Sequence, residues 1–426
     1  MTIKTLVKKV TPQFAIRWYH FGLAFAGAFV CGFPSKRIEV IGVTGTSGKS
    51  TTVNLISGIF EEAGIPTASM SSIRFKIKDK EEPNLLKMTM PGRWRIQKFL
   101  KEAADSGCKI AIIEVTSEGI KQYRHKFIDF QMALFNNLAP EHLESHGGFE
   151  NYRKAKEKLF QAVKNVHIVN LDDDNVDHFL KYPAKRKYGY TVKNSAREEV
   201  EAIKASNIRG GERGIDFEAD GVQINLPLQG EFNVCNALAA MCVGKAKGIG
   251  LDVMKKALEK TQTVPGHMEE VISKPFSVFI DYAFIPSALE KVYKTLKSKA
   301  RTSGGRLIGL LGSCGGGRDK WKRPVLGEIA KKYCDEIIVT NEDPYDEDPE
   351  SIINQVAEGA GPEARKIMDR RAAINQALRL AVAGDVVILI GKGCEPWICV
   401  ADGKKVAWNE KRVVLEEFQE IFPAKE

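Results

Sequence analysis

The stretch IEVIGVTGTSGKSTTVNLISGIFEEAG, residues 38–64, decides the fold of this chain. A β-branched run before the glycines is typical of a buried strand. Between Val53 and Ala63 apolar residues recur at helical spacing, and Gly64 supplies a stop. Strand, glycine-containing loop and helix in this order are the context that a phosphate-binding loop requires.

The loop itself, TGTSGKST at residues 44–51, predicts how phosphate groups are held. Gly45 and Gly48 allow a tight turn whose N–H groups point at phosphate oxygens, and the helix N-terminus adds its positive end. Lys49 is predicted to reach the β- and γ-phosphates, and the Ser50 hydroxyl to bind Mg²⁺. The strict G-x-x-x-x-G-K-[ST] spacing is not met, because Val43 occupies the position of its first glycine. The predicted nucleotide contacts are Thr44, Gly45, Thr46, Ser47, Gly48, Lys49, Ser50 and Thr51.

Apolar runs elsewhere in the chain extend this pattern into an α/β fold. Runs at 109–115, 132–138 and 166–172 predict further buried strands between helical stretches. The alternation restarts after Pro265, where strands are predicted at 276–283, 306–312, 335–341 and 385–393 and a helix at 370–384. The expected fold is a central, doubly wound, mostly parallel sheet carrying the phosphate loop, followed by a second Rossmann-like α/β domain. The predicted parts are a short apolar and basic N-terminal segment at 1–36, a central domain at 37–265 and a C-terminal domain at 266–426.

Composition limits the classes of function. The chain has 426 residues, 43% of them hydrophobic and 27% charged, as in a globular protein with two or three domains. The net charge of +9 suits an anionic ligand, but no dense Lys/Arg stripe with interleaved aromatic residues indicates nucleic acid. Eight scattered cysteines without a CxxC pair indicate reduced thiols, so a cytoplasmic protein is expected.

The N-terminal segment allows two interpretations. The run FGLAFAGAFVCGF at 21–33 is apolar, follows Lys4, Lys8, Lys9 and Arg17, and is too short to span a bilayer. It is either a helix packed on the next domain or a basic amphipathic helix on the inner face of the membrane.

Several segments, in order, resemble the Mur ligase family, and the resemblance runs from about residue 37 to 420. They are TGTSGKST, EVTSEGIKQYR (114–124), NNLAPEHLESHG (136–147), YRKAKEKLF (152–160), GEFNVCNALAA (230–240), VPGHME (264–269), IDYAFIPSALE (280–290), GSCGGGRDKWKRP (312–324), NEDPYDEDP (341–349) and GKGCEPW (391–397). The last three resemble the branch that adds the third residue to UDP-N-acetylmuramoyl-dipeptide. The resemblance implies an ATP-dependent, amide-bond-forming ligase of peptidoglycan synthesis that works through an acyl phosphate.

The resemblance also implies roles for individual residues. Besides Lys49, it implies catalytic roles for Glu114, His142, Lys156 and Arg318, with Mg²⁺ held by Ser50, Glu114, His142 and Lys156 as a carbamate. It places Asn233 and Asn236 at the adenine, Asp281 near the ribose and Arg318 on the γ-phosphate. The predicted substrate contacts are Thr89, Thr116, Gln122, Arg124, Asp343, Lys392 and Glu395.

The incoming amino acid is predicted from one loop. The family loop that binds diaminopimelate reads Asp-Asn-Pro-Arg, whereas this chain has Tyr345 in place of the Arg, so the bidentate partner for a distal carboxylate is lacking. Asp343 and Glu395 offer negative charge, which favours L-lysine or a similar diamino acid. The alternatives are a ligase acting on a lipid-linked wall intermediate, a folylpolyglutamate-type ligase and, in another class, a regulatory phosphate-loop NTPase. A GTPase is disfavoured, because no N-K-x-D segment occurs in the right context.

Overall fold

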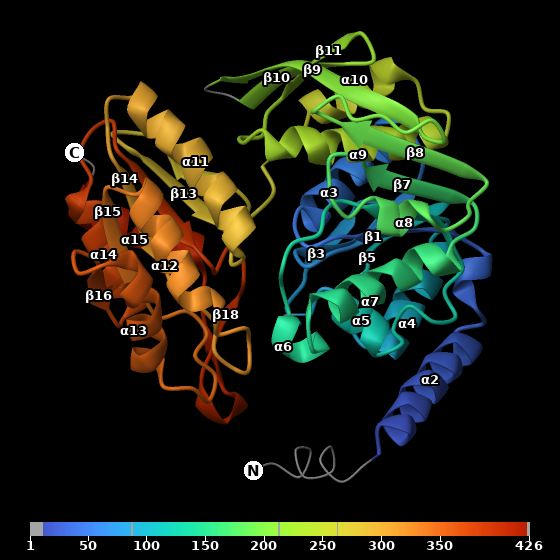
Figure 1. Cartoon of the computed structure of the whole chain (residues 1–426), viewed down its shortest axis with the longest axis horizontal. Coiled ribbons are helices and arrows are strands. Elements are labelled where there is room, and N and C mark those ends of the chain that lie inside the picture. The colour runs from blue at the N-terminus through green and yellow to red at the C-terminus, as the bar shows by residue number, and fades with distance from the viewer. Residues whose placement is uncertain (1–11, 87, 212–213, 262, 424–426) are drawn as a thin grey trace.

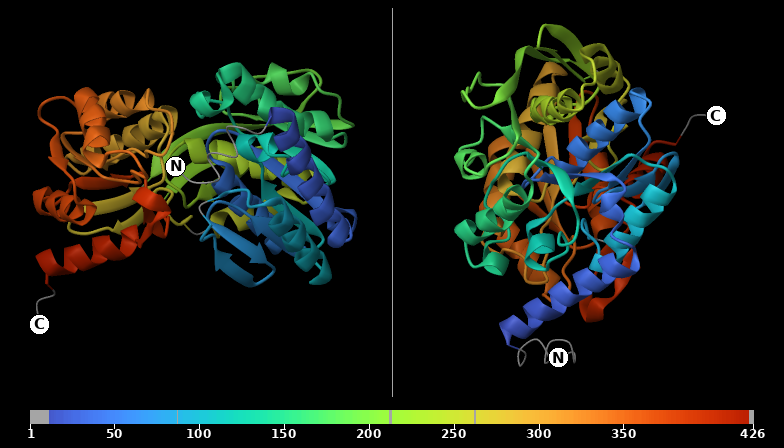
Figure 2. Two further views of the ribbon diagram at one scale, coloured as in Figure 1. Left: turned by 90° about the horizontal axis from the view of Figure 1, so that it is seen from below. Right: turned by 90° about the vertical axis from the view of Figure 1, so that its right-hand side faces the viewer.

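The computed structural model describes residues 12–86, 88–211, 214–261 and 263–423. Lys4, Lys8 and Lys9 of the N-terminal segment lie outside the described residues. The described residues form two α/β bodies side by side (Figures 1 and 2). The first body holds the phosphate loop, and the second is formed by the C-terminal residues.

The first body is built on an eleven-stranded sheet of described residues, in the order β11-β10-β9-β8-β7-β6-β1-β5-β2-β3-β4. The pairings from β9 through to β2 are all parallel, and antiparallel hairpins extend the sheet at both edges. Its strands are β1 (Glu39–Thr44), β2 (Thr67–Met70), β3 (Arg74–Ile77), β4 (Lys80–Pro83), β5 (Ile110–Glu114), β6 (Phe130–Phe135), β7 (Val166–Asn170), β8 (Arg186–Thr191), β9 (Glu201–Gly211), β10 (Gly214–Ala219) and β11 (Val222–Leu226).

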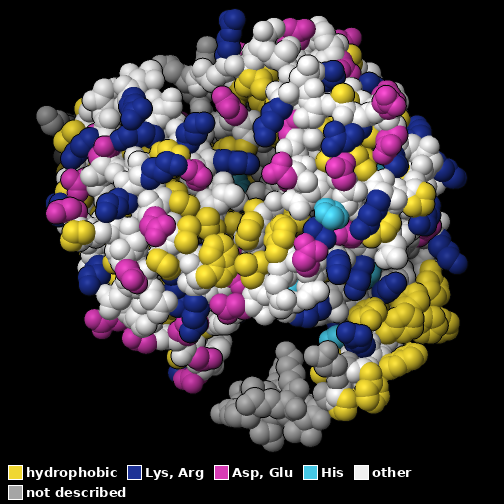
Figure 3. All heavy atoms as spheres, viewed as in Figure 1, with side chains coloured by type: hydrophobic (Ala, Val, Ile, Leu, Met, Phe, Trp, Pro, Cys, Tyr) yellow, Lys and Arg dark blue, Asp and Glu magenta, His cyan; other side chains and the backbone are white. Residues whose placement is uncertain are grey.

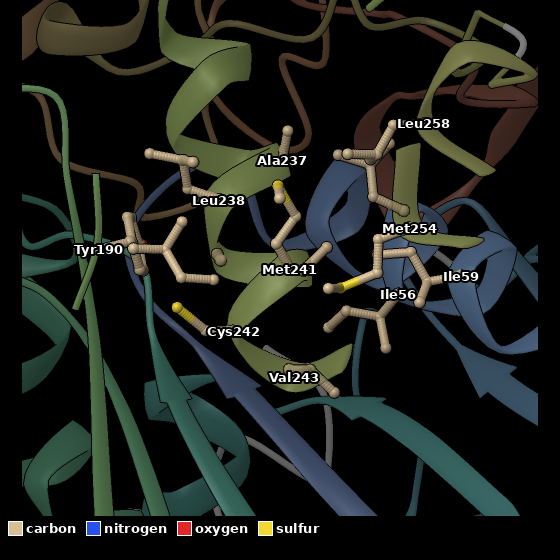
Figure 4. Close-up of a cluster of buried hydrophobic side chains, with 14 of the residues drawn as sticks. Ile56, Ile59, Tyr190, Ala237, Leu238, Met241, Cys242, Val243, Met254 and Leu258 are labelled. Carbon is tan, nitrogen blue, oxygen red and sulfur yellow. The ribbon is translucent and has the colours of Figure 1, made fainter. Parts of the chain in front are cut away.

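Helices cover both faces of this sheet (Figure 1). They are α2 (Gln13–Val30), the short 3₁₀ helix η1 (Pro34–Lys36), α3 (Lys49–Glu62), α4 (Arg93–Asp105), α5 (Ser117–Lys121), α6 (Leu143–His146), α7 (Phe149–Ala162), α8 (Asp177–Leu180), α9 (Phe232–Ala246) and α10 (Leu251–Glu259). On one face, α3 packs against both α9 and α10, and the side chains of α9 meet Ile56, Ile59 and Met254 in a closed core (Figure 4). Burial of these apolar side chains fixes α3, and therefore the loop in front of it, against the sheet.

The second body is a six-stranded sheet in the order β12-β13-β17-β14-β15-β16, parallel except for β12. Its elements are β12 (Glu269–Ile272), β13 (Ser277–Asp281), α11 (Pro286–Thr302), β14 (Leu307–Leu311), α12 (Lys322–Tyr333), β15 (Glu336–Thr340), α13 (Pro349–Ala360), β16 (Arg365–Ile367), α14 (Arg370–Leu380), β17 (Val386–Ile390), β18 (Trp397–Cys399), η2 (Ala401–Gly403), β19 (Lys405–Ala407) and α15 (Glu410–Ile421). The predicted fold class, a doubly wound sheet followed by a second α/β sheet, is confirmed. The proposed boundary at Pro265 lies in the connection between α10 and β12.

A buried ion pair joins two helices of the second body and gives a stability prediction. Arg370 Nε lies 3.1 Å from both carboxylate oxygens of Glu410, and both side chains are almost fully buried. Glu410→Ala leaves the guanidinium buried without its partner, and we expect it to lower the free energy of unfolding by about 3–5 kcal/mol. Arg371, the next residue, is about half exposed and pairs with Glu416 and with the buried Glu417, which also accepts from Asn375. Arg371→Ala is therefore expected to cost less than about 1 kcal/mol. Urea unfolding followed by circular dichroism compares the two, and equal losses would contradict the prediction.

Candidate active site

A cavity of about 600 Å³ lies between the two bodies. Its wall consists of the phosphate loop, the loops after β5 and β6, the first turns of α9 and the loops after β13 and β14. Most of the residues predicted from the sequence line it: Gly45, Thr46, Ser47, Gly48, Lys49, Ser50, Thr51, Thr89, Glu114, Thr116, Gln122, Arg124, His142, Lys156, Asn233, Asn236, Asp281 and Arg318.

The phosphate loop has the backbone that its glycines predict. Gly45 and Gly48 have backbone φ angles of 151° and 79°, a region that residues with a side chain rarely adopt. A Cβ on Gly48 would lie 2.5 Å from Asn236 Oδ1, and one on Gly45 would lie 2.9 Å from Asn136 Cβ. Close neighbours therefore enclose the loop, and only glycine fits at both positions.

Two lysine side chains contact the backbone of the phosphate loop. Lys49 Nζ donates to the Thr46 carbonyl at 3.0 Å, and Lys156 Nζ donates to the Gly45 carbonyl at 2.6 Å. Burial lowers the pKa of both amines; the charge of Lys49 lowers that of Lys156 further, and Glu141 opposes the shift at both. Lys156 thus has a larger neutral fraction at physiological pH than a surface lysine.

Glu114 lies at the end of β5, beside the loop. Its carboxylate accepts the Ser72 N–H at 3.0 Å, and Ser72 Oγ lies 2.7 Å from Ser50 Oγ. Burial raises the pKa of Glu114, and the positive charge of Lys49 partly opposes this rise. A carboxylate and a hydroxyl close together at the phosphate loop are oxygen donors of the kind that Mg²⁺ prefers.

Sequence reasoning missed Glu141, although it chose the neighbouring His142. Glu141 is 3% exposed, and its Oε2 is one of the described buried oxygens without a hydrogen-bond partner. Its Oε1 lies 3.5 Å from Lys322 Nζ of the second body. Burial lowers the pKa of His142 to about 3, so its imidazole is neutral and able to bind a metal ion.

The second body directly contacts the segment after β6, which contains Glu141 and His142. The Asp319 carboxylate accepts the N–H groups of Leu143 and Glu144 at 3.2 and 3.1 Å, holding α6 against the loop after β14. Arg318, the preceding residue, lines the cavity. Asp319 and Lys322 were also missed, because only the packing of the two bodies brings them to the site.

The two asparagines predicted one turn apart on α9 do lie together. Asn236 Nδ2 donates to Asn233 Oδ1 at 2.9 Å, and Thr52 Oγ1 donates to Asn236 Oδ1 at 3.3 Å. Across the cavity wall, the Asp281 carboxylate accepts the Met268 and Ala283 N–H groups, both at 2.7 Å. Contact of these residues with adenine and ribose stays a prediction.

The residues predicted to bind the muramoyl-peptide substrate line the part of the cavity away from the residues predicted to bind adenine. Arg124 donates to Gln122 Oε1 at 2.8 Å and also contacts the Met90 carbonyl, next to Thr89. Thr116 accepts the Gly119 N–H at 3.0 Å and caps α5. A guanidinium and an amide group therefore lie at the cavity end that Thr89 and Thr116 line.

Four predicted site residues do not line the cavity, namely Thr44, Asp343, Lys392 and Glu395. The Thr44 hydroxyl is fully buried and donates to the Val115 carbonyl at 2.8 Å, so it joins β1 to the loop after β5. Lys392, also fully buried, contacts Asp343 at 3.0 Å and Glu395 at 2.8 Å. The Lys392 ammonium is thus paired within the second body, and its single positive charge offsets only one of the two carboxylates. The substrate contacts inferred for Lys392, Asp343 and Glu395 stay predictions.

Comparisons with known proteins agree with this geometry. Residues 43–244 match the family described as Mur ligase middle domain, and residues 267–393 match Mur ligase, glutamate ligase domain. The chain is 34% identical over 404 residues to UDP-N-acetylmuramoyl-L-alanyl-D-glutamate–2,6-diaminopimelate ligase of Clostridium tetani, covering 94% of this chain and 81% of that protein. It is 35% identical over 414 residues to UDP-N-acetylmuramyl-tripeptide synthetase of Roseiflexus sp., covering 91% and 80%. A solved structure of a UDP-N-acetylmuramoyl-L-alanyl-D-glutamate–2,6-diaminopimelate ligase superposes with a TM-score of 0.60 and 30% identity over 90% of this chain and 79% of that one.

Proposed function

Because this chain belongs to the Mur ligase family of ATP-dependent ligases that form peptide bonds, we propose that it adds an amino acid to a UDP-N-acetylmuramoyl-dipeptide-like peptidoglycan precursor. One observation carries the proposal. A single cavity holds the phosphate loop, two buried acids, two lysines and, at its other end, the Gln122–Arg124 pair. Such a cavity has room for a triphosphate and a second anionic substrate next to each other.

The reaction follows from what these groups can stabilise. A carboxylate oxygen of the dipeptide attacks the ATP γ-phosphorus, the bond to the β-phosphate oxygen breaks, and ADP leaves. The amine of the incoming amino acid then attacks the acyl phosphate, loses a proton and displaces inorganic phosphate. Two anions must approach each other in the first step, so positioning and charge neutralisation supply most of the catalysis.

Phosphate binding and charge neutralisation are assigned to residues of both bodies. The loop N–H groups, the N-terminus of α3 and Lys49 would bind the β- and γ-phosphates. Arg318, from the second body, would neutralise charge that develops on the γ-phosphoryl group, whereas the buried Lys322 pairs with Glu141 of the first body. Approach of the two bodies is thus part of forming the site.

The donor set fits Mg²⁺. Ser50, Glu114 and neutral His142 would hold it, and the buried Glu141 Oε2 without a partner supports the presence of a cation in the occupied site. Bound Mg²⁺ supplies neutralisation of the phosphate charge.

Lys156 would act as a carbamate. Its depressed pKa favours the neutral amine that reacts with CO₂, and its position at the Gly45 carbonyl places the resulting anion beside the phosphate loop. An anion there would orient Lys49 and share in holding Mg²⁺.

Thr89, Thr116, Gln122 and Arg124 would bind the muramoyl-peptide, with Arg124 paired to an anionic group of that substrate. The incoming residue remains open between diamino acids. Several relatives are named for 2,6-diaminopimelate, whereas Tyr345 here cannot provide the fork of an Arg. Lys392 offsets one of the two negative charges of Asp343 and Glu395, and the charge that remains favours a substrate with a distal ammonium such as L-lysine.

The test is the identity of the product. UDP-N-acetylmuramoyl-dipeptide, ATP, Mg²⁺ and mixed amino acids are incubated with the protein, and the product is identified by mass spectrometry. We expect one amino acid to be added, with ADP released only when both the dipeptide and that amino acid are present. A heavy oxygen isotope in the dipeptide carboxylate should appear in the released phosphate. ATP hydrolysis that needs neither substrate would instead indicate a regulatory NTPase, and activity only on a lipid-linked or folate substrate would contradict the proposed precursor.

A further inference from the structure

Helix α2 packs in the reverse of the usual manner. The residues that face the first body are small: Ala24 and Ala28 are at most 1% exposed, and a Cβ on Gly27 would lie 3.4 Å from the Trp94 backbone. The large side chains point outward instead, with Trp18 71% and Phe29 64% exposed. A helix stabilised in water by packing normally buries its large apolar side chains and exposes its polar ones.

The outward residues form one apolar surface, here called the aromatic face of α2. Trp18 contacts Phe21 edge-on with ring centroids 6.1 Å apart, and Phe25 stacks on Phe29 at the same distance. Figure 3 shows this surface as a block of hydrophobic side chains at the lower right of the molecule. Its members are Phe14, Trp18, Tyr19, Phe21, Leu23, Phe25, Phe29 and Val30. Among them, Phe21 and Phe25 are partly covered, because their rings also pack edge-on against Phe127 of the first body.

Charge within the stretch of sequence that contains α2 has one sign. Residues 1–38 contain no Asp or Glu, and the first acidic residue of the chain is Glu39. The same residues include Lys4, Lys8, Lys9, Arg17, Lys36 and Arg37, so this stretch of sequence has a formal charge of +6. Of these side chains, Arg37 pairs with Asp105 of α4 at 2.7 Å. In the part of α2 that the structure describes, no acidic side chain interrupts the aromatic face.

We propose that the aromatic face of α2 docks the protein onto an anionic lipid surface. The helix would lie in the plane of the interface, with Trp and Phe side chains among the lipid headgroups and acyl chains and the basic residues at the phosphates. No helix in the described residues is long and apolar enough to cross a membrane, which fits a helix that lies on one. A second copy of the chain on this face would bring two +6 segments together, so the charge favours the lipid surface.

The helix also contacts the substrate end of the cavity. Phe21 of the aromatic face meets the Tyr123 ring edge-on, and Tyr123 lies between Gln122 and Arg124. Arg93, which contacts His20 of α2, donates to the Gln122 carbonyl at 2.9 Å. Docking would therefore hold this end of the cavity near the bilayer, whatever reaction the cavity performs.

Vesicle binding tests the proposal with the full chain. The protein is sedimented with vesicles of phosphatidylcholine alone or with one third phosphatidylglycerol. We expect binding to the mixed vesicles that falls as salt is raised, and binding at least about tenfold weaker to the neutral ones, since each basic residue near an anionic surface strengthens binding about fivefold.

Paired variants separate docking from general stickiness. Trp18→Ser with Phe29→Ser removes two outward side chains and should weaken vesicle binding at least about tenfold. Val382→Ser with Leu415→Ser, which removes exposed apolar residues of the second body, should leave it unchanged. Circular dichroism and ADP release in solution should be normal for both pairs.

Three results would overturn the proposal. They are no sedimentation with mixed vesicles, equal binding to neutral and anionic vesicles, and equal loss in both variant pairs. A dimer that the Trp18/Phe29 variant abolishes, together with no vesicle binding, would assign the face to a second copy instead.

Discussion

Lys156→Ala is expected to lower kcat for ADP release by about 100- to 1000-fold while the protein stays folded. Lys156 is 2% exposed and lies 2.6 Å from the Gly45 carbonyl, where no other described lysine donates. Its pKa is lowered by burial and then by the charge of Lys49, and a lower pKa means more neutral amine at pH 7 to 8. The variant loses the group that would carry a negative charge beside the phosphates.

A neighbouring lysine on α7, Lys158, provides the matched control. Lys158 lies one half-turn away and is exposed, so Lys158→Ala should keep the parent rate. If Lys156 acts as a carbamate, acetate or formate should partly restore the Lys156→Ala variant by placing a carboxylate in the space left behind. The parent protein should also lose activity in CO₂-depleted buffer and show a carbamate signal with ¹³C-bicarbonate. Full activity without CO₂ would contradict the carbamate.

Lys49→Ala is expected to lower kcat/KM for ATP by about 1000-fold. Lys49 is the first residue of α3, and its ammonium lies beside the loop with Glu114 and Glu141 nearby. Binding of the phosphates would replace its contact with the Thr46 carbonyl by stronger contacts to anionic oxygens. Its loss therefore affects both nucleotide binding and the charge that develops on phosphoryl transfer.

Kinetics and nucleotide binding measure this effect. Steady-state ADP release gives kcat/KM, and titration with a non-hydrolysable ATP analogue gives the loss of binding. Lys260→Ala, which removes an exposed lysine paired with Glu62 at 2.7 Å, is the control and should behave as the parent protein. A Lys49→Ala variant within tenfold of the parent would mean that the loop does not hold the triphosphate as proposed.

Strands buried on both faces could be predicted, but the edges of the sheet could not. The runs that became β1, β5, β6 and β7 are mostly apolar, because helices cover both sides of these strands. At the edge, β4 is the fully exposed segment Lys80–Pro83, which has no apolar pattern. Such strands form because a neighbouring strand offers hydrogen bonds, and a single segment carries no signal of that neighbour.

Some residues of the candidate site could likewise be predicted from the sequence, and others could not. Glu114 and the phosphate loop lie next to strand signals and could be found from the sequence. Glu141, Lys322 and Asp319 meet only where the two bodies touch, 181 residues apart along the chain for the first two. Resemblance selected Asp343 and Lys392 as substrate contacts, but their mutual salt bridge became visible only in the packed structure.

By itself the sequence determined the local features of this protein, namely the strand, the loop with Gly45 and Gly48, and the helix that Lys49 begins. These depend on backbone conformation and on the spacing of neighbouring residues, which a sequence contains directly. Tertiary structure decided which lysine of α7 is buried, which acids lack a partner, and that the large side chains of α2 point outward. Burial and charge pairing depend on residues distant in the chain, so only packing assigns them.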